Sequence, residues 1–155
     1  MAISIDNIDL LAHVANASRN LSLLLDARLR GLGLTEARGR VLWFLAQQSG
    51  PVGQGRVTAF MQVENPTAVR VLDGLEGLGY VRRLPDPGDR RAKLIELTIA
   101  GRMAAEQVMR LAREINRDIM RGVDPADFES VKRVLSRIVE NATRSDSDEP
   151  LEVPA

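Results

Sequence analysis

The stretch from Asn65 to Gly101 reads NPTAVRVLDGLEGLGYVRRLPDPGDRRAKLIELTIAG, and it decides the fold. Asn65 followed by Pro66 predicts a helix start, because asparagine caps helices and proline is tolerated in the first helical turn. Behind this start, apolar residues at three-residue spacing predict one buried helix face, made of Val69, Leu72, Leu75 and Leu78. The helix is expected to end at residues 77–79, where glycine can take the left-handed conformation of a C-terminal cap.

Two short apolar runs follow this helix, separated by a turn signal. Residues 80–84 and 93–97 predict strands, and the sequence DPGD at residues 86–89 predicts the turn between them. The alternation of the second run is imperfect, so the hairpin prediction depends on the turn more than on strict period. Basic residues crowd the tip of this hairpin. A helix followed by a basic hairpin predicts a winged helix-turn-helix in a mainly α protein with a small β-hairpin.

A helix beside a basic hairpin has the shape and charge to bind duplex DNA. A helix fits the major groove, which is roughly 12 Å wide, and a hairpin tip can reach the narrower minor groove beside it. Arginine suits that tip, because its planar charged group is attracted to the negative potential of a narrow groove.

The same residues resemble the MarR family of bacterial transcription regulators, and its SlyA-like branch most. The resemblance is carried by residues 69–76, 79–81 and 86–92, and by Leu97-Thr98 with Gly101, in this order and spacing. It extends more weakly over residues 34–38 and the flanking helices. The resemblance implies an obligate-type homodimer that pairs through its N- and C-terminal helices and regulates transcription, most often as a repressor.

The totals are those of one globular domain. The chain has 155 residues, 45% hydrophobic and 27% charged, and no run approaches the roughly 20 apolar residues that a membrane span needs. Its start lacks the pattern of a signal peptide, so we expect a cytoplasmic protein without membrane contact. The absence of cysteine and the single histidine predict no metal site, and we expect no cofactor.

The formal net charge is zero, with 21 basic and 21 acidic side chains. Nucleic-acid-binding proteins are often basic overall, but the local field matters more than the total. Basic residues gather on the hairpin, whereas acidic residues gather in the last ten positions.

Along the chain, four regions are expected: an N-terminal dimerisation helix (1–32), the winged helix-turn-helix (33–98), C-terminal dimerisation helices (99–144) and a disordered acidic tail (145–155). The first helix carries more apolar surface than one small domain covers. It is interpreted as a dimerisation helix in preference to a core helix. The first helix of the helix-turn-helix is expected within residues 53–63. There Thr58 and Gln62 replace the alanine and glycine usual in the family, which leaves the angle between the two helices open.

Base contacts are assigned to the second helix of the helix-turn-helix. Arg70 is the candidate for base edges, because arginine bidentate to guanine is the commonest specific contact. The alternative is an ion pair with Asp73, three residues further along the same helix. Asn65 and Thr67 are expected to contact phosphates or bases, and Ala68 is a candidate for contact with a thymine methyl group.

Arg90 and Arg91 are the minor-groove candidates of the hairpin. The resemblance implies that one arginine inserts while Asp89 braces the tip, and we favour Arg90 for insertion. The alternative is that Asp89 holds one of the two arginines, which would then order the tip instead of contacting DNA. Phosphate contacts are assigned to Arg82, Arg83 and Lys93, with Arg38 and Arg56 as weaker candidates.

A two-fold symmetric dimer would read a pseudo-palindrome with half-sites about 10 base pairs apart. A small molecule between the dimerisation helices and the helix-turn-helix would change the separation of the two DNA-binding units. The expected cavity is lined by the first helix, the helix of Trp43 and the start of the long helix near residue 99. The resemblance implies an aromatic or lipophilic acid as the effector. Trp43 and His13 are the ligand-binding candidates, against a core role for the tryptophan and a solvated or core role for the histidine.

The sequence has two other interpretations, a protein-interaction module and an enzyme. A winged-helix dimer can use the same helix to bind a protein partner, and the zero net charge and acidic tail are compatible with this interaction module. Binding of random-sequence duplex at low salt would discriminate between the two. An enzyme is not expected, because the sequence has no nucleophile motif, phosphate loop or metal-spaced histidines.

Overall fold

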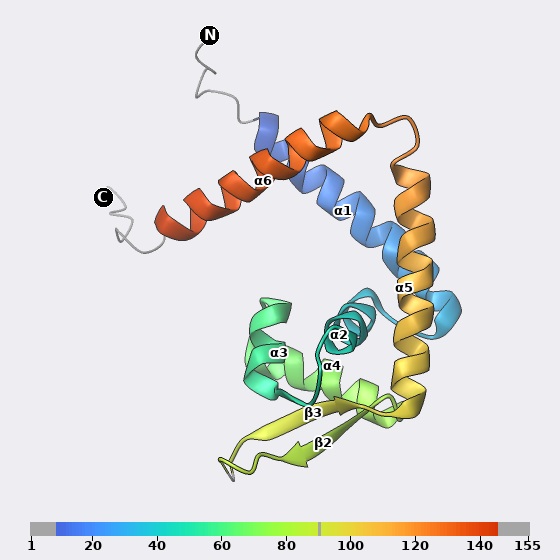
Figure 1. The fold of residues 1–155 in the computed structure, drawn as a ribbon, viewed down its shortest axis with the longest axis vertical. Helices are drawn as coiled ribbons and strands as arrows, with labels where there is room; N and C mark the ends of the chain where they lie inside the picture. The colour runs from blue at the N-terminus through green and yellow to red at the C-terminus, as the bar shows by residue number, and fades with distance from the viewer. Residues whose placement is uncertain (1–8, 90, 146–155) are drawn as a thin grey trace. The chain divides into compact units, whose positions relative to one another are not determined.

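The computed structural model describes residues 9–89 and 91–145 (Figure 1). Its elements, in chain order, are α1 (Asp9–Leu29), the 3-10 turn η1 (Arg30–Leu32), α2 (Glu36–Ala46), β1 (Val52–Gly53), α3 (Gln54–Met61), α4 (Asn65–Gly77), β2 (Val81–Pro85), β3 (Lys93–Leu97), α5 (Ile99–Ile119) and α6 (Pro125–Ser145). The chain divides into two compact units after Asn116, and α6 belongs to the second. The predicted acidic tail lies outside the described residues, apart from Ser145.

The expected hairpin is present, but it belongs to a three-stranded antiparallel sheet of order β1-β3-β2. Val81 pairs with Leu97 and Pro85 with Lys93, so β2 and β3 match over their whole length. The predicted hairpin is therefore confirmed, and β1 adds a third strand in which Val52 pairs with Ile95. Two residues are too few to show an alternation in the sequence.

The helix-turn-helix consists of α3, a short turn and α4. Gln62 begins the turn with φ 54° and ψ 42°, and it is the one non-glycine residue with positive φ in the described chain. A residue with a Cβ is strained in this left-handed conformation by about 1–2 kcal/mol. The glutamine therefore accepts the conformation that glycine supplies in the family. Thr58 turns its hydroxyl back to donate to the carbonyl of Gln54 at 3.2 Å.

The buried face of α4 is the predicted one in its middle and differs at its two ends. Leu72 and Leu75 are fully buried as predicted, whereas Ala68 is buried in place of Val69 and Leu78 is 44% exposed. Glu64 occupies the N-cap position and makes no side-chain cap hydrogen bond, so Asn65 is the first helical residue instead of the cap.

The C-terminal end of α4 is closed as predicted. Gly79 has φ 71°, and its N–H donates to the carbonyl of Glu76 at 2.8 Å. The N–H of Tyr80 donates to the carbonyl of Leu75 at 2.9 Å. This pair of bonds satisfies carbonyls that the helix leaves without partners.

Thr98 joins α4, the sheet and α5. Its hydroxyl donates to the carbonyl of Gly79 at 2.6 Å and accepts from the N–H of Gly101 at 3.0 Å. Its own N–H donates to the carbonyl of Tyr80 at 3.0 Å. Thr98 is therefore the N-cap of α5, and the same residue binds α5 to the end of α4.

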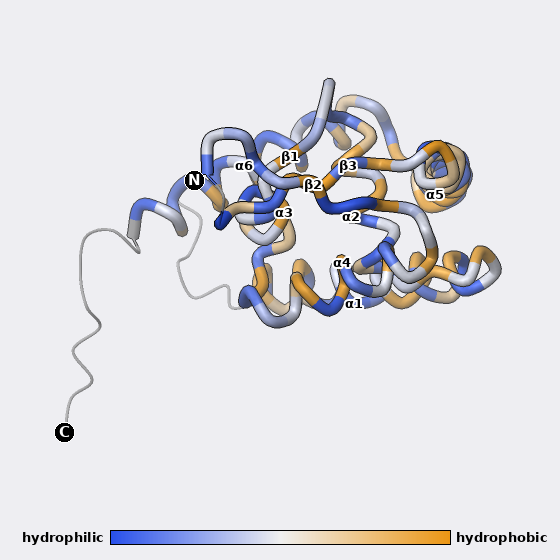
Figure 2. The backbone as a smooth tube through the Cα atoms, turned by 90° about the horizontal axis from the view of Figure 1, so that it is seen from below, coloured by the Kyte–Doolittle hydropathy of each residue, from blue (hydrophilic) through white to orange (hydrophobic). Residues whose placement is uncertain are grey.

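One hydrophobic core holds the first unit together. It is built from the inner faces of α2, α3, α4, α5 and the sheet, and its largest fully buried side chains are Leu42, Leu72, Leu75, Ile95, Val41 and Val57. Figure 2 shows apolar and polar residues alternating along α1 and α5. That alternation gives each helix one face suited to a core and one suited to water.

Two helices keep large apolar side chains in contact with solvent. On α1 these are Leu10, Leu11, Val14, Leu21 and Leu23. On α6 they are Phe128, Val131, Val134, Leu135 and Val139, and no described residue of α6 is buried. None of the described helices is long and apolar enough to cross a membrane.

Candidate nucleic-acid interface

The outward face of α4 carries three of the four residues assigned to it. Asn65, Thr67 and Arg70 are exposed. Ala68 is fully buried in the core beneath them, so the predicted contact with a thymine methyl group is wrong. The error follows from the start of the buried face, because Ala68 is fully buried there and Val69 only partly.

Arg70 is not held by Asp73. The Asp73 carboxylate accepts from the Nη2 atom of Arg83 at 2.6 Å instead. No hydrogen bond or ion pair occupies Arg70 within the described part of the chain. The guanidinium of Arg70 is therefore available on the outward face of α4.

Arg83 reaches from β2 across to α4. Its Nη2 atom contacts Asp73 at 2.6 Å, and its Nη1 atom pairs with the Glu76 carboxylate. Burial opposes the charge of this guanidinium, but the hydrogen bonds and charges of the two carboxylates outweigh it and raise the pKa of Arg83. The predicted phosphate contact of Arg83 is corrected, because both ends of its guanidinium are engaged within the protein.

Arg82 and Lys93 point away from the core, as phosphate-binding residues would. The Nε and Nη2 atoms of Arg82 contact Glu96 Oε2 at 2.7 and 2.6 Å, and its side chain is 61% exposed. Lys93 is exposed at the start of β3. Of the weaker candidates, Arg56 is exposed on α3, whereas the guanidinium of Arg38 lies against Gly74 of α4.

The hairpin of β2 and β3 is the wing of the winged helix-turn-helix, and two aspartates order its tip. Asp86 Oδ1 accepts from the N–H of Gly88 at 2.8 Å, and Asp89 Oδ1 accepts from the N–H of Arg91 at 2.8 Å. Asp89 thus holds the backbone of the tip, and the side chain of Arg91 is exposed. Arg90, the favoured minor-groove residue, lies outside the described residues.

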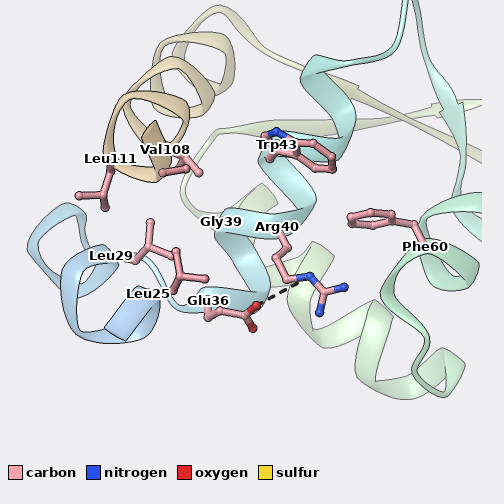
Figure 3. Close-up of a pocket in the computed structure, with 10 residues that line it drawn as sticks. Leu25, Leu29, Glu36, Gly39, Arg40, Trp43, Phe60, Val108 and Leu111 are labelled. Atoms are coloured by element: carbon pink, nitrogen blue, oxygen red, sulfur yellow. Dashed lines mark ion pairs between the residues drawn. The ribbon is translucent and has the colours of Figure 1, made fainter. Parts of the chain in front are cut away.

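A cavity of about 430 Å³ lies beside the helix-turn-helix, within the first unit (Figure 3). It is lined by Leu25 and Leu29 of α1, by Glu36, Gly39, Arg40 and Trp43 of α2, by Phe60 of α3, and by Val108, Leu111 and Ala112 of α5. The expected lining by the first helix, the Trp43 helix and the long helix is confirmed. The contribution of the long helix comes from its middle and not from its start.

The two charged side chains of the cavity lining are paired with each other. Arg40 Nε lies 3.7 Å from Glu36 Oε1, and its guanidinium lies 5.5 Å from the centre of the Phe60 ring. Figure 3 shows Arg40 extending from α2 towards Phe60. Three residues of the lining were not predicted from the sequence, namely Glu36, Arg40 and Phe60. The spacing of four between Glu36 and Arg40 predicts an ion pair, but not the cavity beside it.

His13 does not line this cavity, so its assignment as a ligand contact is corrected. Its ring lies on the exposed surface of α1, where Nδ1 is 2.7 Å from the carbonyl oxygen of Asp9. Within residues 9–89 and 91–145, no three histidine, aspartate or glutamate side chains gather as a metal ion would require.

The turn between α3 and α4, the exposed Arg70 on α4 and the β2–β3 hairpin together form a winged helix-turn-helix. The comparisons with known proteins agree. The sequence model of the MarR family matches residues 34–93. The chain belongs to the MarR family.

Solved structures resemble this chain over nearly their whole length. The transcriptional regulator PA3341 is 37% identical over 86% of this chain and 97% of its own, with a TM-score of 0.78. A probable transcriptional regulator from Pseudomonas aeruginosa is 29% identical over 86% of this chain and 97% of its own, with a TM-score of 0.72. MepR from S. aureus, solved in a complex with DNA, is 23% identical over 87% of this chain and 98% of its own. Its TM-score is 0.76, and this likeness concerns the fold alone.

Proposed function

We propose that the protein is a dimeric repressor that reads a pseudo-palindromic operator and is released from it by a small aromatic or lipophilic ligand. The observation that carries the proposal is the free guanidinium of Arg70 on the outward face of α4, beside the cationic wing. Arginine in a major groove discriminates guanine through two parallel hydrogen bonds.

The surrounding side chains suit the phosphates on either side of the groove. The side chains of Asn65 and Thr67 are exposed in the first turn of α4, where the helix dipole favours an anion. Arg82 and Lys93 lie exposed on the wing, and Arg91 on its tip. These contacts would set the register of the protein on DNA, while Arg70 reads sequence.

The exposed apolar side chains of α1 and α6 support dimerisation. Large apolar surfaces on a monomer mark an interaction site, and both helices carry five such side chains each in the regions assigned to dimerisation, 1–32 and 99–144. Two copies joined in this way would present two α4 helices to successive major grooves.

We assign this homodimer to the cytoplasm. The wing motif at residues 86–92 supports the SlyA-like branch.

Substitution of Arg70 by alanine tests the proposed function. An operator is first selected from a random pool of duplexes with the full-length protein. R70A is expected to bind that operator about 10- to 100-fold more weakly, because bidentate guanine contacts contribute about 1–3 kcal/mol of discrimination. Affinity for random duplex should change much less. Fluorescence anisotropy at one fixed salt concentration measures both affinities.

Arg113→Ala is the matched control, since Arg113 is an exposed helical arginine on α5, outside the helix-turn-helix and the wing. It is expected to leave the operator affinity within about twofold. Equal losses in the two variants would contradict base reading by Arg70. A wild-type protein that binds no duplex at low salt would favour the protein-interaction module.

The cavity supports release by a ligand. Its lining joins α1 and α5 to α2 and α3, so an occupant can alter how the helix-turn-helix is held. The walls are mostly apolar, and the one ion pair is internal to the lining. This chemistry suits an aromatic or lipophilic molecule with few polar groups.

Trp43 allows this ligand site to be tested directly, because it is the single tryptophan of the chain and lines the cavity. Titration with 4-butylbenzoate or its neutral amide is expected to change the tryptophan fluorescence saturably. At saturation, the operator affinity should fall about 10-fold, within the usual range of allosteric coupling.

Ala112→Phe fills the cavity and is expected to abolish both the fluorescence change and the loss of operator affinity. Ala100→Phe, on the exposed start of the same helix, should retain both. Saturable fluorescence changes that survive in A112F would assign the ligand to another site.

A further inference from the structure

The carboxylates of Asp73 and Glu76 present a difficulty for a DNA-reading helix. Asp73 lies three positions after Arg70, and Glu76 lies three positions after Asp73, so Asp73 is the helical neighbour of both. The Asp73 side chain is 58% exposed and that of Glu76 is 41% exposed. Uncompensated, Asp73 would attract the guanidinium of Arg70, and both carboxylates would repel phosphates.

Arg83 removes this difficulty within the protein. It lies on the same face of β2 as the buried Val81, and its side chain is only 21% exposed. Arg83 is the middle residue of β2 and pairs with the fully buried Ile95 of β3, so its backbone is held by the central strand of the sheet. From there its two terminal nitrogens engage Asp73 and Glu76 separately.

Arg82 gives a direct comparison, because neighbouring residues of a strand point to opposite faces. Its side chain is 61% exposed and turned to the outer face, where its partner Glu96 belongs to the next strand of the same sheet. Arg82 therefore links two strands of the wing, whereas Arg83 links the wing to α4.

We infer that Arg83 is a positioning residue for specificity, which occupies Asp73 and thereby leaves Arg70 free to read bases. Arg83 itself touches neither base nor phosphate in this role. The inference rests on the proposed function, since it explains how Arg70 stays available. It predicts that loss of Arg83 reduces discrimination between duplexes, and not merely affinity.

The test measures affinity for the selected operator and for random duplex of equal length, in the wild type, R83Q, D73N and R83Q/D73N, at one salt concentration. R83Q is expected to lower the ratio of the two affinities about 10-fold, because Asp73 then competes for Arg70. The added D73N substitution should restore the ratio to within about threefold of wild type. D73N alone should leave the ratio unchanged.

Arg82→Gln is the matched control, since it removes an arginine of the same charge from the adjacent position of β2. It is expected to lower both affinities together and to preserve their ratio, as loss of a phosphate contact does. Circular dichroism and the melting temperature establish that each variant is folded. If R83Q unfolds, R83K and R83K/D73N replace it, because lysine can engage only one carboxylate at a time.

A preserved ratio in folded R83Q would overturn the inference, and so would a lowered ratio that D73N fails to restore. Either result leaves the proposed function standing, provided that the wild type discriminates operator from random duplex. A wild type that does not discriminate would instead overturn the proposed function.

Discussion

Replacing Gly101 by alanine is expected to destabilise the fold by about 3 kcal/mol or more, because the added methyl group has no room. A Cβ at this position would lie 1.8 Å from the carbonyl oxygen of Tyr80 and 2.8 Å from its carbonyl carbon. Both are backbone atoms, so they cannot turn aside as the end of a side chain can. A shift of α5 that relieved the clash would stretch the 3.0 Å bond from the N–H of Thr98 to the same oxygen.

Urea unfolding at one fixed protein concentration measures this loss. Gly77→Ala is the matched control, because a Cβ on Gly77, the last residue of α4, would meet no atom within 4 Å. Alanine there should leave the free energy of unfolding unchanged or raise it by up to about 1 kcal/mol. Equal stabilities for G101A and G77A would show that α5 can move away from Tyr80 at no cost.

Replacing Arg90 and Arg91 together by alanine is expected to weaken operator binding by about 100-fold, while the dimer remains intact. The physical reason is the loss of two cationic side chains at each wing tip, where the tip would enter a narrow groove of negative potential. The Asp89 carboxylate would still accept from the backbone N–H of residue 91, so the shape of the tip should survive. Anisotropy measures the affinity, and analytical ultracentrifugation the oligomeric state.

The dependence of affinity on salt provides a second measurement for this variant. Each lost phosphate contact reduces the number of counterions released, so the fall of log K with log salt should become shallower than in the wild type. Arg110→Ala with Arg113→Ala removes the same charge from exposed positions of α5. This control pair should retain the wild-type affinity and slope. A tip variant that behaved like the control pair would refute the role of the wing.

Much of the fold could be predicted because its signals are local. Helix α4 ends where Gly79 takes a left-handed conformation, and Thr98 caps α5, as glycine and threonine at those positions indicate. The buried face of α4 was predicted correctly at Leu72 and Leu75 and wrongly at its two ends. Ala68 has a small side chain that contributes little to a hydropathy pattern, whereas the larger Val69 contributes more. In the structure, however, it is Ala68 that is fully buried.

The candidate site depends more on tertiary contacts, and the sequence predicted less of it. A run of two arginines in a strand does not say which one faces solvent. The structure answers this by pairing Arg83 with carboxylates seven and ten residues earlier in the chain. Phe60, which lines the cavity, stacks on Phe44 of α2 with ring centres 4.2 Å apart, and no spacing along the chain predicts this contact between two helices.

Thr98 also determines how motion passes through the first unit. Its hydroxyl and its N–H donate to the consecutive carbonyls of Gly79 and Tyr80, and its hydroxyl accepts from the first turn of α5. These hydrogen bonds couple the end of α4 directly to α5. A tilt of α5 would therefore displace the end of α4 as well. In the proposed regulator, that displacement would misalign the α4 residues that are proposed to contact the bases.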